Sequence, residues 1–193
     1  RTKYKADYGD YLNALCGDPE IAPLMGGVLC WHSYFVDKKP SLLVPQRTLL
    51  RNALETYPGW RFWQTEYCVM QGPEGNGGGS RDLGMDTALH VARILHCDIT
   101  RTNVSAWQWW TALSPCDFKD GLIYTNWQQE GDPVSILPTK TLWALGHFSR
   151  YIRPGSRRLG LVGGDVIEGL MASAYRTQDQ RLVVVVVNAK DKP

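Results

Sequence analysis

Apolar positions in the first 110 residues switch repeatedly between a helical stripe and a short unbroken run. Residues 7–15 carry apolar side chains at helical spacing and are followed by Gly17, which predicts a helix that ends there. Residues 27–34 form a short apolar run between glycines and a charged segment, which predicts a strand buried on both faces. A second helical stripe runs from residue 50 to 57 and ends at the Pro58-Gly59 pair.

The same alternation of strand and helix then repeats. Residues 60–67 predict another buried strand, residues 85–95 an amphipathic helix, and residues 104–110 a third strand. Strands that alternate with helices of this length indicate parallel βα units, because a parallel pair needs a helical crossover. Three such strands cannot close a barrel.

Beyond residue 110 the pattern changes to a long loop, one more helix and a β-rich end. Residues 111–137 predict the loop, and residues 140–152 predict a helix that ends at Pro154-Gly155. Three later segments are β-rich, and the polar stretch 176–180 predicts an antiparallel hairpin between the last two. These segments are 159–162, 166–175 and 182–188.

The run Val183–Val187 predicts a strand that is buried on both faces. As an edge strand it would be prone to aggregation. We therefore expect the β-rich module to be cut short, or to be completed by residues that are not in this chain.

Composition narrows the classes of function. The hydrophobic content of 44% suits a globular domain, and the nearly balanced charges, with a net value of +2, favour neither nucleic acid nor an acidic membrane surface as a partner. No apolar stretch approaches the roughly 20 residues that span a bilayer. Eight tryptophans and nine tyrosines favour a carbohydrate site, because flat aromatic faces stack on sugar rings, although aromatics also fill ordinary cores.

No metal or organic cofactor is expected. The five cysteines are widely spaced and form no Cys-x-x-Cys pair, so we expect most of them to be core thiols, with one disulfide open if the protein is exported. The loop Gly72–Gly79 lacks the Gly-Lys-Ser/Thr ending of a phosphate-binding loop, which argues against a kinase or an oxidoreductase. A mobile lid over the site is the interpretation we favour for this loop.

Glu66 is the most informative candidate for chemistry. It ends the predicted strand 60–67, and in βα barrels the working residues lie where strands end. A carboxylate on a buried strand is costly unless it is paired or faces an open site. It is either a structural glutamate bonded to a neighbouring strand or a nucleophile that attacks an anomeric carbon.

Other candidates follow the ends of the neighbouring strands. His32 and Tyr34 can hydrogen-bond Glu66 or a substrate, although a histidine between aromatics is often a core residue. Trp107 and Trp109 share one face of their strand, which gives either a sugar platform or plain core packing. Trp110 points to the opposite face.

Four motifs in this order resemble glycoside hydrolase family 30. They are His-Ser-Tyr at 32–34, Trp-Gln-Thr-Glu-Tyr at 63–67, Ser-Ala-Trp-Gln-Trp-Trp at 105–110 and Ala-Leu-Gly-His-Phe-Ser-Arg-Tyr-Ile-Arg-Pro-Gly at 144–155. The resemblance runs from about residue 20 to the end of the chain.

The resemblance implies an α/β fold: the C-terminal portion of a (β/α)8 TIM barrel, strands six to eight, followed by part of an antiparallel β-sandwich. Residues 1–152 would form the partial barrel and residues 153–193 the partial sandwich. It implies a retaining β-glycosidase in which Glu66 is the nucleophile. His32, Tyr34, Tyr67, Trp107 and Trp109 would bind the carbohydrate substrate.

The family's acid/base glutamate belongs to barrel strand four, in an Asn-Glu pair that this sequence lacks. A retaining mechanism needs two carboxyls roughly 5 Å apart. We therefore expect a fragment that needs the remainder of the same enzyme, barrel strands one to five, as its partner, and that is inactive alone. The family also implies a secreted enzyme, although no signal peptide is present in this chain.

Residues 105–124 look most like the endo-β-1,6-galactanase-like branch of the family. A competing interpretation is a non-catalytic carbohydrate-binding or interaction module, in which tryptophans hold the glycan and Glu66 only hydrogen-bonds it.

Overall fold

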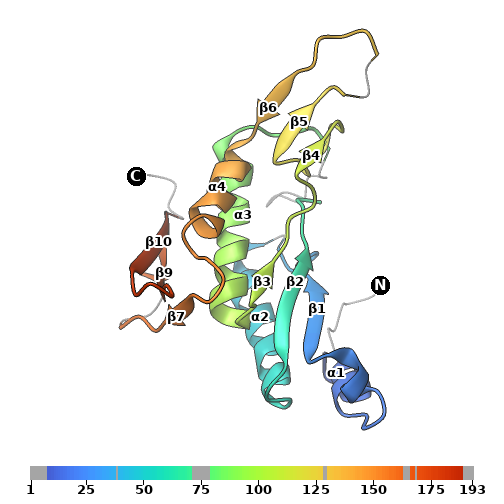
Figure 1. Cartoon of the computed structure of the whole chain (residues 1–193), viewed down its shortest axis with the longest axis vertical. Coiled ribbons are helices and arrows are strands. Elements are labelled where there is room, and N and C mark those ends of the chain that lie inside the picture. The colour runs from blue at the N-terminus through green and yellow to red at the C-terminus, as the bar shows by residue number, and fades with distance from the viewer. Residues whose placement is uncertain are drawn as a thin grey trace.

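A computed structural model of the chain describes residues 8–37, 39–70, 79–127, 130–162, 166–167 and 169–188. Figure 1 shows a parallel sheet in front of long helices, a small sheet beyond the ends of its strands, and a separate antiparallel sheet at the C-terminal side. None of the described helices is long and apolar enough to span a membrane.

The parallel sheet contains β1 (Val28–His32), β2 (Arg61–Glu66) and β3 (Ala106–Trp107), in the order β1-β2-β3. This confirms the predicted parallel unit, which is not closed into a barrel in this chain. β3 is shorter than the strand predicted over 104–110. Its flanks still follow β2, because the backbone N–H groups of Ser105 and Gln108 donate to carbonyls of that strand.

Four α-helices accompany the strands in the part of the chain that the structure describes. They are α1 (Tyr8–Cys16), α2 (Pro40–Glu55), α3 (Met85–Cys97) and α4 (Lys140–Ser149). The 3-10 helix η1 (Ala22–Met25) precedes β1, and the π-helical turn η2 (Asp98–Thr102) continues α3. α2 begins ahead of its predicted stripe, and α4 stops before the predicted Ile152, whose N–H still donates to the Phe148 carbonyl.

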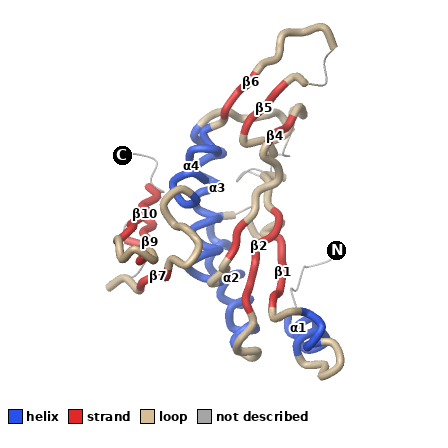
Figure 2. Tube along the Cα trace, viewed as in Figure 1, coloured by secondary structure: helices blue, strands red, loops and turns tan. Residues whose placement is uncertain are grey.

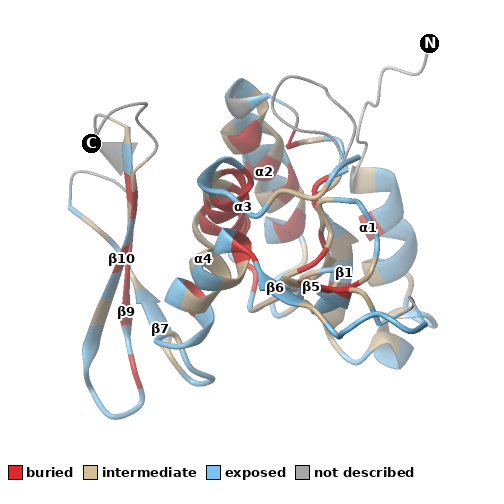
Figure 3. Cartoon of the chain, turned by 90° about the horizontal axis from the view of Figure 1, so that it is seen from above, coloured by how far each residue is buried: buried red, intermediate tan, exposed pale blue. Residues whose placement is uncertain are grey.

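α3 is the centre of the fold. Nine of its 13 residues are buried, as expected for a helix with neighbours on several sides. Its apolar residues join a cluster that extends from Tyr67 after β2 to Phe148 of α4 and Val185 of β10. Figure 3 shows the helices between the parallel sheet and the C-terminal strands, so the two sheets pack on opposite sides of the helix layer.

The prediction that the first strand is buried on both faces is wrong for this chain. Leu29 of β1 is buried in a cluster with residues of α1 and α2, whereas Cys30 and His32 on the other face are exposed. The described residues supply helices to one face of the sheet only. An unbroken apolar run shows that a strand can be buried on both faces. It does not show which neighbouring elements cover each face.

The expectation that most cysteines are core thiols is also wrong. None of the five forms a disulfide; Cys97 is buried, Cys16 and Cys68 are partly buried, and Cys30 and Cys116 are exposed. Cys30 is exposed because it lies on the uncovered face of β1.

The predicted loop 111–137 contains a small sheet. Its strands are β4 (Leu113–Ser114), β5 (Ile123–Thr125) and β6 (Ile136–Pro138), with β4 parallel and β6 antiparallel to β5. In the tube of Figure 2 they are short strand segments between longer loops. Strands of two or three residues are too short to leave a periodic pattern and could not be predicted from apolar spacing.

The C-terminal sheet is antiparallel, as predicted. β9 (Leu170–Arg176) pairs with β7 (Arg157–Leu159), β8 (Val166–Ile167) and β10 (Leu182–Asn188), and the predicted polar turn joins β9 to β10.

The valine run in β10 is buried on one face only, contrary to prediction. Val185 and Val187 are buried in the cluster with the helices, whereas residues Val184 and Val186 are 54% and 57% exposed. The outer face of this sheet is therefore uncovered in the described structure.

Candidate active site

The ends of the parallel strands bring the candidate residues together. His32 ends β1, Glu66 ends β2 and Trp107 ends β3. A register shift between Trp31 and His32 places His32 opposite Glu66 instead of Thr65. Parallel strands present their carboxyl ends at one edge, which is where ligands bind in such sheets.

Glu66 lies at this edge with its carboxylate open to solvent. Its side chain is 36% exposed, and the Tyr34 hydroxyl donates a hydrogen bond of 2.9 Å to Oε1. His32 Nδ1 lies 3.8 Å from the same oxygen. The carboxylate is thus both oriented and reachable, unlike a glutamate that is bonded inside the core.

Tyr34 is suited to act as a permanent donor. Burial, the neighbouring Cys68 thiol and the Glu66 carboxylate raise the pKa of Tyr34 far above its ordinary value, so the hydroxyl keeps its proton at neutral pH. The Tyr34 oxygen lies 3.7 Å from Cys68 Sγ, and burial raises the pKa of that thiol. Cys68 was not among the predicted site residues, although it stands two residues after Glu66.

Trp107 and Trp109 form an aromatic wall against Tyr67, the residue after Glu66, with 6.0 Å between ring centroids in each pair. Their rings stack with centroids 6.3 Å apart and an angle of 23° between planes, so the two side chains share a face as their spacing predicted. Both residues are half-buried and pack against the core cluster that contains Tyr67. Trp110, which was not among the predicted substrate-binding residues, is 54% exposed.

Tyr67 lies below the surface of the site. Its side chain has no exposed area, and its hydroxyl donates to Asp37 Oδ2 at 2.6 Å with His90 Nε2 at 3.3 Å. Its ring stacks on that of Tyr34, with 5.7 Å between centroids. Tyr67 in this arrangement supports Tyr34 from beneath and offers no side-chain surface to a sugar.

Asp98, a buried acid that the sequence analysis missed, lies behind the strand ends. Its carboxylate accepts hydrogen bonds from Ser33, Arg47 and Trp107. Burial raises the pKa of Asp98, and the Arg47 guanidinium opposes that rise. The available signal was an aspartate placed directly after the apolar helix α3.

The remaining predictions concern the loop Gly72–Gly79 and a metal site. Residues 72–78 of the proposed lid lie outside the described residues. Within the described part of the chain, no group of three or more His, Cys, Asp or Glu side chains is arranged to hold a metal ion.

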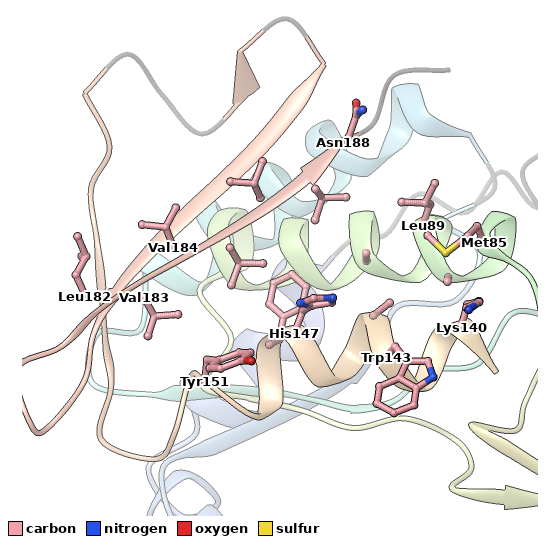
Figure 4. Close-up of a pocket in the computed structure, with 17 residues that line it drawn as sticks. Met85, Leu89, Lys140, Trp143, His147, Tyr151, Leu182, Val183, Val184 and Asn188 are labelled. Carbon is pink, nitrogen blue, oxygen red and sulfur yellow. The ribbon is translucent and has the colours of Figure 1, made fainter. Parts of the chain in front are cut away.

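A hollow of about 530 Å³ lies elsewhere, between α3, α4 and β10. Figure 4 shows His147 of α4 and Tyr151, which follows the helix, beside the valines of β10, with Trp143 farther along α4. Neither Glu66 nor the aromatic wall lines it. We regard this hollow as the gap between the helix layer and the C-terminal sheet, because its walls offer few polar groups for chemistry.

The chain matches a known protein family over more than half of its length. Residues 10–124 match the family described as O-Glycosyl hydrolase family 30. A conserved exported protein from Bacteroides fragilis is similar over 100% of this chain and 43% of its own, with 26% identity and a TM-score of 0.76.

Two enzymes share the fold at lower identity. An endo-β1,6-glucanase has 17% identity and a TM-score of 0.66, over 93% of this chain and 38% of its own. A family 30 subfamily 8 xylanase from Clostridium acetobutylicum has 20% identity and a TM-score of 0.61, over 92% and 36%. The chain therefore spans less than half the length of each of these structures.

Proposed function

Because this chain belongs to O-glycosyl hydrolase family 30, we propose that it is the nucleophile-bearing part of a retaining β-glycosidase. The observation that carries the proposal is the Glu66 carboxylate, which is partly exposed at the end of β2 and accepts the Tyr34 hydrogen bond. Partial exposure favours the nucleophile over the alternative of a glutamate that is enclosed and bonded to a neighbouring strand.

In the proposed mechanism Glu66 attacks the anomeric carbon from below the sugar ring. A general acid protonates the departing oxygen, and a covalent glycosyl-enzyme forms and is then hydrolysed by water. Tyr34 holds the attacking oxygen in place, and His32 contacts Glu66 or the substrate. Trp107 and Trp109 offer ring surface to the sugar, whereas Tyr67 acts through Tyr34.

The general acid is proposed to come from outside this chain. The described strands cover only part of a barrel, and the similar structures are more than twice as long. We propose that residues 1–152 belong to the barrel and residues 153–193 to a β-sandwich. The remainder of the same enzyme, barrel strands one to five, then covers the open face of β1 that exposes Cys30.

A β-linked polysaccharide or oligosaccharide is the proposed substrate. The resemblance of residues 105–124 to the β-1,6-galactanase-like branch makes β-1,6-galactan the first polysaccharide to test. The similar structures include a xylanase and an endo-β1,6-glucanase, so xylan and β-1,6-glucan are the comparison substrates. Export is proposed as well, since one similar structure is an exported protein.

The test uses the complete enzyme that contains this chain, assayed on aryl β-glycosides. Glu66→Gln should lower kcat by at least about a thousandfold, because removing a nucleophile costs several orders of magnitude. Glu55→Gln is the matched control, since Glu55 is an exposed glutamate on α2. Retained turnover in Glu66→Gln would show that Glu66 is not the nucleophile. Turnover by the isolated chain would contradict the proposal that the general acid comes from outside this chain.

A second candidate is a non-catalytic carbohydrate-binding module, which the stacked pair of Trp107 and Trp109 favours. Under this alternative the complete protein binds glycan but does not cleave it. Trp109→Ala then abolishes binding, while Glu66→Gln changes it little.

A further inference from the structure

Asp98 occupies an unusual place for a carboxylate. It begins the π-helical turn η2 and has no exposed surface. Its Oδ2 accepts hydrogen bonds of 2.8 Å from both Ser33 Oγ and Trp107 Nε1. Its Oδ1 accepts from Arg47 Nε at 2.6 Å.

The two donors to Oδ2 come from the ends of the two strands that flank β2. Ser33 stands between His32 and Tyr34, the two residues beside Glu66. Trp107 is one half of the aromatic wall. A single carboxylate oxygen therefore connects the end of β1 to the end of β3, on either side of the strand that carries Glu66.

This arrangement is costly if it serves stability alone. Asp98 and Arg47 are both fully buried, and well-packed apolar residues of similar volume often stabilise a core as well as a buried ion pair. A buried polar network with directed donors does fix one arrangement of its members. Single π-helical turns are also frequent at functional sites.

We propose that Asp98 is a positioning residue for the Glu66 reaction, which fixes the distance between the β1 end and the aromatic wall. The inference rests on the proposed function. Asp98 acts through Ser33, which sets the path of the chain into Tyr34, and through Trp107, which sets the plane of the ring surface. It does not itself touch the substrate.

Three substitutions in the complete enzyme separate positioning from general stability. Asp98→Asn removes the charge, Ser33→Ala removes one donor, and Trp107→Phe removes the other donor while it keeps an aromatic ring. Thr139→Ala is the control, because Thr139 is a buried residue that caps α4 and contacts none of these groups.

The expected result is a change in kcat on activated aryl β-glycosides. Each single variant should lower kcat by about ten- to a hundredfold with a smaller change in KM, because hydrogen bonds to a charged group are lost. The double variant of Ser33 and Trp107 should be no worse than Asp98→Asn, since all three act through one carboxylate. Thr139→Ala should lower the melting temperature and leave kcat unchanged.

A second readout does not depend on activity. The indole N–H resonance of Trp107, assigned with Trp107→Phe, should move in Asp98→Asn and stay in place in Thr139→Ala, because only the first change alters its acceptor. If the wild-type enzyme is active and the three variants change kcat no more than Thr139→Ala does, the positioning role is wrong and the proposed function still stands. A wild-type enzyme without glycosidase activity overturns the proposed function and this role with it, whereas the indole shift still reports whether the contact exists.

Discussion

Replacing Arg47 by methionine should destabilise the protein far more than any exposed substitution on the same helix. Arg47 has no exposed surface, and its Nε lies 2.6 Å from Oδ1 of Asp98, which is equally buried. Methionine keeps much of the side-chain volume but leaves the Asp98 carboxylate with only the Ser33 and Trp107 donors. Breaking a buried pair in this way costs about 3–5 kcal/mol.

Arg51 provides a matched control one helical turn later. Its Nε lies 3.0 Å from Oε1 of Glu55, but the two side chains are 39% and 58% exposed. Exposed pairs at this spacing contribute about 0.3–0.5 kcal/mol, so Arg51→Met should change stability by little. The two variants differ in burial and not in the type of contact that is removed.

Urea denaturation of the complete enzyme, followed by tryptophan fluorescence, measures both variants. The deficit of Arg47→Met should be smaller at pH 5 than at pH 8. Burial raises the pKa of Asp98, and loss of Arg47 removes the group that opposes this rise, so the unpaired carboxylate is neutralised as pH falls. Equal deficits for Arg47→Met and Arg51→Met, or a deficit that grows toward acid, would refute the reasoning.

Three further substitutions test separate parts of the structure. Tyr34→Phe keeps the ring but removes the donor to Glu66, so kcat should fall by about ten- to a hundredfold, and an unchanged kcat would exclude an orienting role. Burial lowers the pKa of His90 below its ordinary 6.5, so the unfolded chain takes up the proton first as pH falls and the folded state loses stability below that value. In urea titrations His90→Gln should therefore lose less stability between pH 7 and pH 5 than the wild type. An equal loss in the two proteins would rule His90 out as the cause. Val185→Ala should cost about 2 kcal/mol and Val184→Ala less than about 0.5 kcal/mol, because only Val185 is buried; equal costs would contradict the one-sided burial of β10.

The sequence predicted features that depend on neighbours along the chain. Apolar spacing located α3, and the alternation of strands and helices indicated the parallel sheet. The proximity of His32, Tyr34 and Glu66 was also accessible, because parallel strands end at one edge. That inference needs only the order of the strands and the residues at their ends, not the distances between the strands.

Other features depend on which layers are present, and the sequence could not supply them. The runs around Cys30 and Val184 are apolar, yet each strand is covered on one side only in the described structure. The role of Asp98 was inaccessible for a similar reason, since its partners Ser33 and Arg47 are 65 and 51 residues away along the chain. Tyr67 adjoins Glu66 in sequence, but packing against Tyr34 turns it into the interior.

Covalent trapping of the complete enzyme tests the central claim most directly. A 2-deoxy-2-fluoro-β-glycoside with a good leaving group forms a glycosyl-enzyme that turns over slowly, and peptide mass spectrometry locates the attached sugar. The account predicts one sugar per enzyme on the peptide that carries Glu66, and no label in Glu66→Gln. A sugar attached to any other carboxylate of an active enzyme would contradict it.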